Sequence, residues 1–115
     1  MLNRLEGLDR VFQALADPTR RDMVERLVQA PASVSQLAEP LPMSLPAVVQ
    51  HLAVLESAGM VSSEKVGRVR TCHLEPEMLR RAETWLGAQR TAWEDRLDRL
   101  GAELAPPEDQ LRPQR

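Results

Sequence analysis

The side chains that most often carry out chemistry in proteins are scarce in this chain. Its 115 residues include two histidines and one cysteine, namely His51, Cys72 and His73. Cys72 and His73 are neighbours on an expected strand, so their side chains point to opposite faces and cannot hold one metal ion together. The sequence has no Gly-rich phosphate loop and no HExxH motif, and its carboxylates are scattered. We therefore expect no catalytic site, no metal site and no cofactor.

Residues 44–59, SLPAVVQHLAVLESAG, have a pattern that suits a different chemistry, the recognition of base edges in duplex DNA. Ser44 is a good N-cap, Pro46 follows it in the first turn, and Gly59 can end the helix in a left-handed conformation. One face repeats apolar residues at helical spacing and is expected in the core: Val48, Leu52 and Leu55. The opposite face is nearly uncharged: Pro46, Val49, Gln50, Ala53 and Ser57. The pattern predicts the recognition helix of a helix-turn-helix, with an ordinary amphipathic helix as the alternative.

After Gly59 the apolar period changes from 3.6 to 2, which predicts a hairpin. Residues 60–66 and 69–74 form its strands, and Gly67-Arg68 forms its tip. The segment 60–73 has three bases, Lys65, Arg68 and Arg70, and one acid, so its net charge is +2 in a chain whose net charge is −2. This local charge is typical of a wing that contacts phosphates or the minor groove. The alternative is that the tip is charged only because hairpin tips are solvated.

The segments before the recognition helix are predicted to form three helices. The first covers 5–16 and has a wide apolar face. The second runs from Pro18 to Gln29 after an Asp17 cap, with Met23, Val24, Leu27 and Val28 inward, and the third covers 34–39 after a Ser33 cap. Arg20 and Arg21 lie in the first turn of the second helix, where cations oppose the helix dipole. We expect Asp17, Asp22 or a DNA phosphate to be their partner.

The last helix is expected from about Glu77 to Leu104. At 1.5 Å per residue it is ~40 Å long, which is more than a small winged domain can cover. It therefore needs a second surface, and another copy of the chain is the simplest one. The first helix is the expected co-contributor. The expected dimer contacts are Leu5, Leu8, Phe12, Leu79, Trp85, Leu86, Trp93, Leu97 and Leu100. The two tryptophans could alternatively line the pocket of a hydrophobic effector.

The length and composition of the chain indicate that these elements form one domain. We expect it to cover residues 1–104, followed by a polar, proline-containing and disordered tail over 105–115. The hydrophobic content is 43%, but no apolar run reaches the ~20 residues of a membrane span, and the N-terminus lacks a secretory signal. The single cysteine fits a cytoplasmic protein. Cys72 is either a thiol sensor or, more commonly, a small buried residue.

Several motifs in order resemble those of one family. LADPTRR (15–21), SVSQLAEPL (33–41) and MSLPAVVQHLAVLESAGMVSSEKVGRVR (43–70) are similar to the ArsR-type winged helix-turn-helix repressors, and most similar to the SdpR-like branch without metal ligands. The resemblance implies a mainly α fold with a small β-hairpin. It also implies a homodimer formed by the N- and C-terminal helices, and cytoplasmic binding to an inverted-repeat operator in double-stranded DNA.

The resemblance also assigns DNA contacts. On the recognition helix these are Ser44, Leu45, Pro46, Val49, Gln50 and His51; on the wing they are Lys65, Arg68 and Arg70, and Arg20 is added from the second helix. Many relatives have serine in place of Val49 and a polar residue in place of Leu45. We therefore expect this helix to read DNA by apolar contact and shape more than by polar pairing.

A second class of function remains open at this point. A winged-helix protein-interaction module that does not bind DNA is favoured by the apolar recognition face and by the negative net charge, while the basic wing argues against it. No motif in the sequence specifies the operator, the regulated genes or a small-molecule effector.

Overall fold

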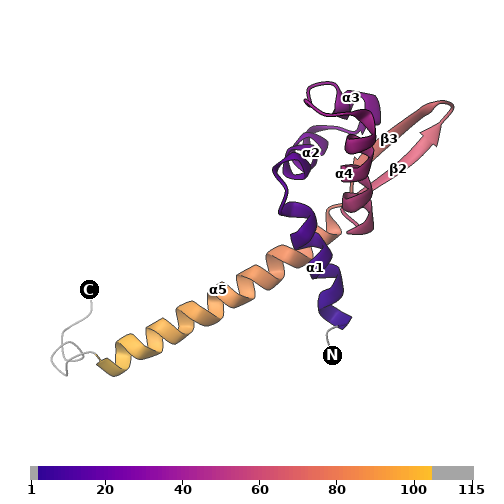
Figure 1. Ribbon diagram of the computed structural model, residues 1–115. Helices are drawn as coiled ribbons and strands as arrows, with labels where there is room; N and C mark the ends of the chain where they lie inside the picture. Colours follow the sequence, from indigo (N-terminus) through magenta and orange to yellow (C-terminus); the bar gives the residue numbers. More distant parts are fainter. Residues whose placement is uncertain (1–2, 105–115) are drawn as a thin grey trace. The chain divides into compact units, whose positions relative to one another are not determined.

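A computed structural model describes the backbone of residues 3–104 and the side chains of residues 7–104. The helices are α1 (Asn3–Leu15), α2 (Pro18–Gln29), α3 (Val34–Ala38), α4 (Leu45–Ser57) and α5 (Glu77–Leu104), and the strands are β1 (Ala32–Ser33), β2 (Val61–Val66) and β3 (Val69–Leu74) (Figure 1). The expected tail over 105–115 and the side chain of Leu5 lie outside the described residues.

The chain divides into two compact units, Met1–Ala82 and Glu83–Arg115. The first unit holds the core, whose largest fully buried side chains include Met23, Leu37, Leu52, Leu55 and Met60. The described part of the second unit is the remainder of α5. The mainly helical winged architecture expected from the sequence is confirmed, and each expected helix is present to within two residues at either end.

The turn between α1 and α2 is held by the Asp17 cap. Its carboxylate accepts from the backbone N–H of Thr19 at 2.8 Å and of Arg20 at 3.1 Å, and Pro18 occupies the first helical position. The hydrogen bond from the Arg20 N–H, above all, holds the pKa of Asp17 below its ordinary value. The cap therefore contributes stability while Asp17 is ionised and loses it as the pH falls through that lowered pKa.

Of the expected partners of the two arginines, Asp17 interacts with Arg20, but the guanidinium groups of both arginines donate mainly to backbone carbonyls. Arg21 donates from Nη1 to the carbonyl of Leu15 at 2.8 Å, and Arg20 also donates to carbonyls at the end of α1. Asp22 pairs instead with Arg26, at 3.9 Å. The last carbonyls of a helix have no intrahelical donor and carry the negative end of its dipole, so they attract guanidinium groups.

The short helix α3 is closed at both ends by side chains. Ser33 and Gln36 form a capping box, with Gln36 N–H donating to Ser33 Oγ at 3.1 Å and Ser33 N–H donating to Gln36 Oε1 at 2.8 Å. At the other end, Arg26 of α2 donates to the carbonyls of Gln36 and Leu37, each at 2.8 Å. These contacts fix the first half of the helix-turn-helix against α2.

The sheet has one strand more than the sequence indicated. Its order is β1-β3-β2, and both pairs are antiparallel. The two-residue β1 pairs Ala32 with Cys72 and Ser33 with Thr71. Two residues are too few to show a period, which is why sequence reasoning missed this strand.

The prediction that Val28 points inward was wrong, because Val28 lies in the last turn of α2 and is 58% exposed.

Cys72 lies in the core. Its side chain is fully buried, and burial raises the pKa of its thiol, so the unreactive protonated form is favoured. The interpretation of Cys72 as a small buried residue is confirmed. His73, on the opposite face of β3, has its Nε2 3.6 Å from Glu64 Oε1.

No helix between residues 3 and 104 is both long and apolar enough to cross a membrane.

Candidate nucleic-acid interface

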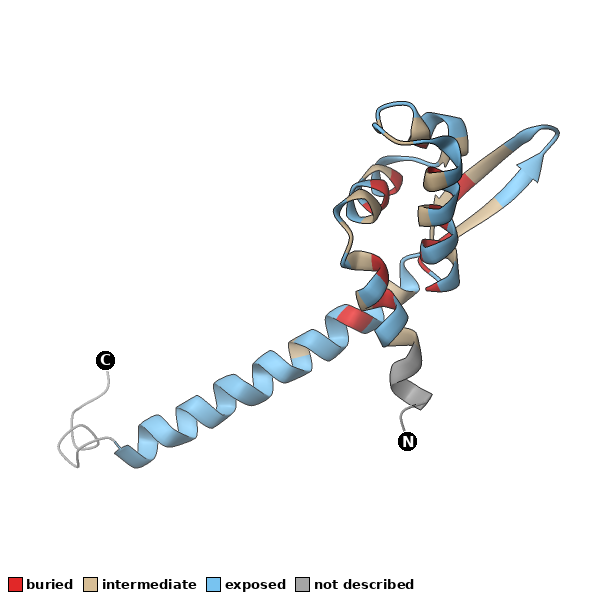
Figure 2. Ribbon diagram, in the orientation of Figure 1, coloured by how far each residue is buried: buried red, intermediate tan, exposed pale blue. Residues whose placement is uncertain are grey.

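The helix α4 presents one buried face and one exposed face. Ser44 Oγ accepts from the N–H of Ala47 at 3.3 Å and opens the helix, while Val48, Leu52 and Leu55 are fully buried. The other face is exposed along its length (Figure 2). It begins with two apolar side chains, Leu45 at 53% and Val49 at 38% exposure, followed by Gln50. A face with short side chains and no formal charge is able to approach the floor of a major groove closely.

The end of α4 determines where the hairpin begins. Gly59 has φ +75°, its N–H donates to Glu56 O at 2.9 Å, and the Met60 N–H donates to Leu55 O at 3.0 Å. These two bonds define a Schellman motif, and Leu55 and Met60 bury its hydrophobic contact. A side chain at residue 59 would be strained at this φ, and its Cβ would lie 3.3 Å from Met78 Cγ. The glycine thus couples the recognition helix directly to β2.

The hairpin carries its basic residues in two different environments. β2 and β3 pair from Val61↔Leu74 to Val66↔Val69, and Gly67, with φ +63°, makes the tip beside Arg68. Lys65 and Arg68 are exposed. Arg70, the cross-strand neighbour of Lys65, donates to Ser63 Oγ at 2.9 Å and forms an ion pair with Glu56 at the end of α4. Arg70 therefore ties the hairpin to the recognition helix, and Glu56 is a residue that sequence reasoning missed.

Arg20 reaches α4 from the N-terminus of α2. Its Nε donates to Ala14 O at 2.8 Å and its Nη2 to Gln13 O at 3.1 Å, both at the end of α1. Its Nη1 lies 3.1 Å from Nδ1 of His51. The structure thus brings together two of the candidate residues that are 31 positions apart in the sequence.

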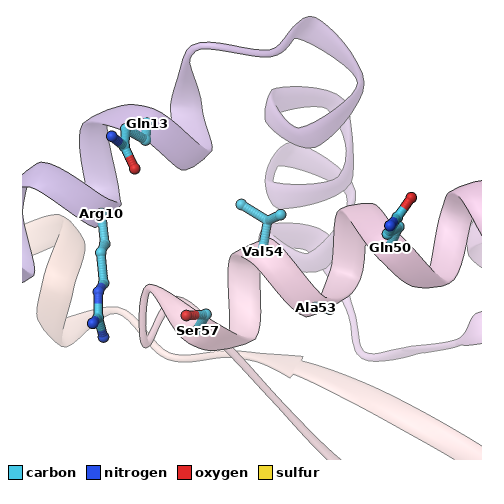
Figure 3. Close-up of a pocket in the computed structure, with 6 residues that line it drawn as sticks. All are labelled: Arg10, Gln13, Gln50, Ala53, Val54 and Ser57. Atoms are coloured by element: carbon cyan, nitrogen blue, oxygen red, sulfur yellow. The ribbon is translucent and has the colours of Figure 1, made fainter.

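Two shallow hollows lie along α4, one bordered by α1 and the other by the first turn of α2. One, of about 380 Å³, is lined by Arg10 and Gln13 of α1 and by Gln50, Ala53, Val54 and Ser57 of α4 (Figure 3). The other, of about 240 Å³, is lined by Arg20, Ala47, Gln50, His51 and Val54. The hollows share Gln50 and Val54, and among residues 7–104 no acidic side chain lines either of them. Arg10 and Gln13 were not expected at the site, because only the packing of α1 on α4 places them there.

The candidate dimer residues fall into two groups. Leu8, Phe12 and Leu79 are half-buried and pack against the core of their own chain. Trp85, Leu86, Trp93, Leu97 and Leu100 of α5 are 41–54% exposed in the single chain. The Arg96 guanidinium lies 5.8 Å from the centre of the Trp93 ring.

Among residues 7–104 no three His, Cys, Asp or Glu side chains gather as a possible metal site.

A short helix-turn-helix followed at once by an antiparallel hairpin defines a winged helix-turn-helix protein. Comparison with known proteins agrees. Residues 15–64 match the family model described as a helix-turn-helix domain. The crystal structure of the ArsR family transcriptional regulator RHA00566 superposes with a TM-score of 0.75 at 48% identity, over 77% of this chain and 92% of that one. The chain belongs to the ArsR family of transcriptional regulators.

Two curated relatives are consistent with that family. Over 68 residues the chain is 52% identical to the HTH-type transcriptional regulator Rv2034 of Mycobacterium tuberculosis, a match covering 59% of this chain and 64% of Rv2034. Over 79 residues it is 28% identical to the transcriptional repressor SdpR of Bacillus subtilis, covering 69% of this chain and 88% of SdpR. The chain therefore spans somewhat less than two thirds of Rv2034.

Proposed function

We propose that this protein is a cytoplasmic, homodimeric repressor that binds an inverted-repeat operator in double-stranded DNA. The α4 helix enters the major groove with Ser44, Leu45, Pro46, Val49, Gln50 and His51, and the β2–β3 hairpin lies on flanking phosphates or the minor groove. The observation that carries the proposal is the adjacency of a lightly charged, exposed helix face and an exposed basic hairpin tip, joined by a Schellman turn.

The roles of the basic residues follow from their environments. Lys65 and Arg68 are exposed, so their charge is available to phosphate oxygens. Arg70 is paired with Glu56, so we assign it to holding the hairpin at its angle and not to neutralising DNA. Gln50 is exposed at the middle of the helix face, where a side-chain amide can make a bidentate pair with adenine.

The dimer is supported by the sequence and exposure of α5. Leu79, Leu86, Trp93 and Leu100 repeat every seven residues, and Leu97 and Leu104 extend the same stripe. From Leu86 onward these side chains are 42–80% exposed in one chain. A symmetric pair of such helices buries the stripe of both copies, with α1 alongside.

The test is a binding titration of the purified protein with the duplex upstream of its own coding sequence, repeated at several salt concentrations. We expect tighter binding than to a scrambled duplex of equal length, and affinity that falls steeply with salt. The protected region should contain two half-sites about one helical turn, ~34–36 Å, apart. The absence of salt-sensitive binding to any duplex would favour the protein-interaction module instead.

Val49 is expected to influence which operator is preferred. Val49→Ser replaces an apolar contact with a hydroxyl that can hydrogen-bond to a base edge. A mismatched base pair in such a site typically costs ~1–3 kcal/mol of binding free energy. We expect the preferred half-site to change when both proteins select from a randomised operator library. Val28→Ser is the matched control, because Val28 is also a solvent-exposed valine, at 58% against 38% for Val49, but lies in the last turn of α2 and not on α4. Identical rankings for Val49→Ser and the wild type would contradict this role.

A further inference from the structure

The guanidinium of Arg20 is held in place before any ligand arrives. Its Nε and Nη2 donate to the carbonyls of Ala14 and Gln13, at 2.8 and 3.1 Å. These carbonyls end α1, where the helix dipole favours a cation. With two of its nitrogens anchored on one helix end, the third, Nη1, has a fixed position beside the ring of His51.

The contact between Arg20 and His51 determines where the imidazole proton lies. A guanidinium has five N–H donors and no acceptor. His51 Nδ1, 3.1 Å from Arg20 Nη1, must therefore accept, which requires a neutral ring. In a neutral ring whose Nδ1 accepts, the single proton is on Nε2. Arg20 thus prepares His51 as a hydrogen-bond donor through Nε2 without giving it a charge.

The surroundings of the ring favour an anionic oxygen as the acceptor. His51 is half-buried and lines the smaller hollow together with Arg20 and Gln50, and the adjoining hollow adds Arg10. The carboxylate that interacts with both Arg20 and His51 is that of Asp17, and its oxygen already accepts from two backbone N–H groups. Basic and amide side chains without a lining acid match the phosphates that border a major groove.

We propose that Arg20 is a positioning residue for DNA binding. It holds the neutral His51 ring with its proton on Nε2, and this N–H donates to a phosphate oxygen of the strand that borders α4. The inference deepens the proposed function and depends on it for the second step, whereas the first step concerns the free protein alone. Each of the three guanidinium nitrogens of Arg20 makes one contact within the protein, and these contacts fix the group beside His51, through which we assign its effect on DNA.

The first step is tested by NMR on the free protein, using multiple-bond proton–nitrogen correlations of the His51 ring. We expect a single tautomer, with an unprotonated, hydrogen-bonded Nδ1 and a proton on Nε2. Arg20→Gln should shift the Nδ1 resonance towards that of a nitrogen without a donor. Arg21→Gln is the matched control, since Arg21 also donates to a carbonyl at the end of α1, whereas the contact with His51 is made by Arg20. A proton on Nδ1, or equal shifts in both variants, would overturn the proposal.

The second step is tested with His51 variants and the upstream duplex. The amide nitrogen of His51→Gln reaches the position of Nε2, whereas that of His51→Asn reaches only the position of Nδ1. A hydrogen bond to a charged group is worth about tenfold or more in affinity. We therefore expect His51→Gln to bind within about threefold of the wild type, and His51→Asn and His51→Phe to bind about tenfold more weakly. Thermal melts check that each variant is folded.

The two proposals fail in different ways. If His51→Asn binds as well as His51→Gln, the donor at Nε2 is unnecessary and the role of His51 is overturned while DNA binding stands. If the wild-type protein binds no duplex, the proposed function is overturned, and with it the phosphate contact, although the tautomer measurement still decides the role of Arg20 in the free protein.

Discussion

Leu86→Glu is expected to convert the protein to a monomer and to lower its operator affinity by at least about 100-fold. Leu86 is 52% exposed in the single chain and lies in the stripe of large apolar residues on α5. In a symmetric dimer that buries this stripe, each copy carries one glutamate into the apolar seam, so two carboxylates are desolvated. A monomer holds one half-site at a time and loses the effective concentration that links the two halves of an operator.

Two measurements check this prediction. Sedimentation analysis gives the oligomeric state, and a titration with the upstream duplex gives the affinity. Thr91→Glu is the matched control, because it adds the same charge to the same helix at an exposed position two residues before Trp93, outside the seven-residue repeat. If Leu86→Glu remains dimeric, or if Thr91→Glu has the same effect, the apolar stripe of α5 is not the dimer contact.

The double substitution Lys65→Ala and Arg68→Ala is expected to weaken binding to every duplex by a similar factor. Each phosphate contact contributes ~0.9 to the slope of log affinity against log salt, so losing two lowers the slope by about 2. At 0.15 M salt this corresponds to a loss of about 10- to 30-fold. The preference between operator and scrambled DNA should change little, because phosphate contacts carry no sequence information.

The control for this pair removes the same charge from another surface. Arg80 and Arg81 are 66% and 63% exposed at the start of α5, where both pair with Glu77. Arg80→Ala with Arg81→Ala should leave the salt slope near that of the wild type. An equal loss in both double variants would mean that the net charge of the chain, and not the hairpin tip, governs the attraction to DNA.

Most of the fold is predictable from the sequence because its determinants are local. The caps at Asp17, Ser33 and Ser44 lie within three residues of the N–H groups that they accept from, and Gly59 ends α4 through bonds to its last turn. Periodicity likewise identified the buried face of α4, since Val48, Leu52 and Leu55 are all fully buried. These local signals can be recognised without knowing which elements pack together in the fold.

The site was less predictable because its contacts join distant segments. Arg20 meets His51 across 31 positions and Arg70 meets Glu56 across 14, and neither pair has a spacing that a sequence pattern can reveal. The charge of the hairpin and the family resemblance both placed Arg70 among the DNA contacts, and neither could show its ion pair with Glu56. Likewise, Arg10 and Gln13 border the recognition helix only because α1 packs against α4.

The Glu56–Arg70 ion pair has a further consequence for how such a protein can diversify. It sits at the junction of α4 and the hairpin, where the Schellman turn leaves little freedom, so the two DNA-facing elements keep a constant separation. A new binding sequence is then reached most simply by exchanging side chains on the helix face, because the geometry of the half-site is preserved. Loss of Glu56 or Arg70 would instead let the separation of α4 and the hairpin vary, and the protein would then tolerate half-sites of different lengths.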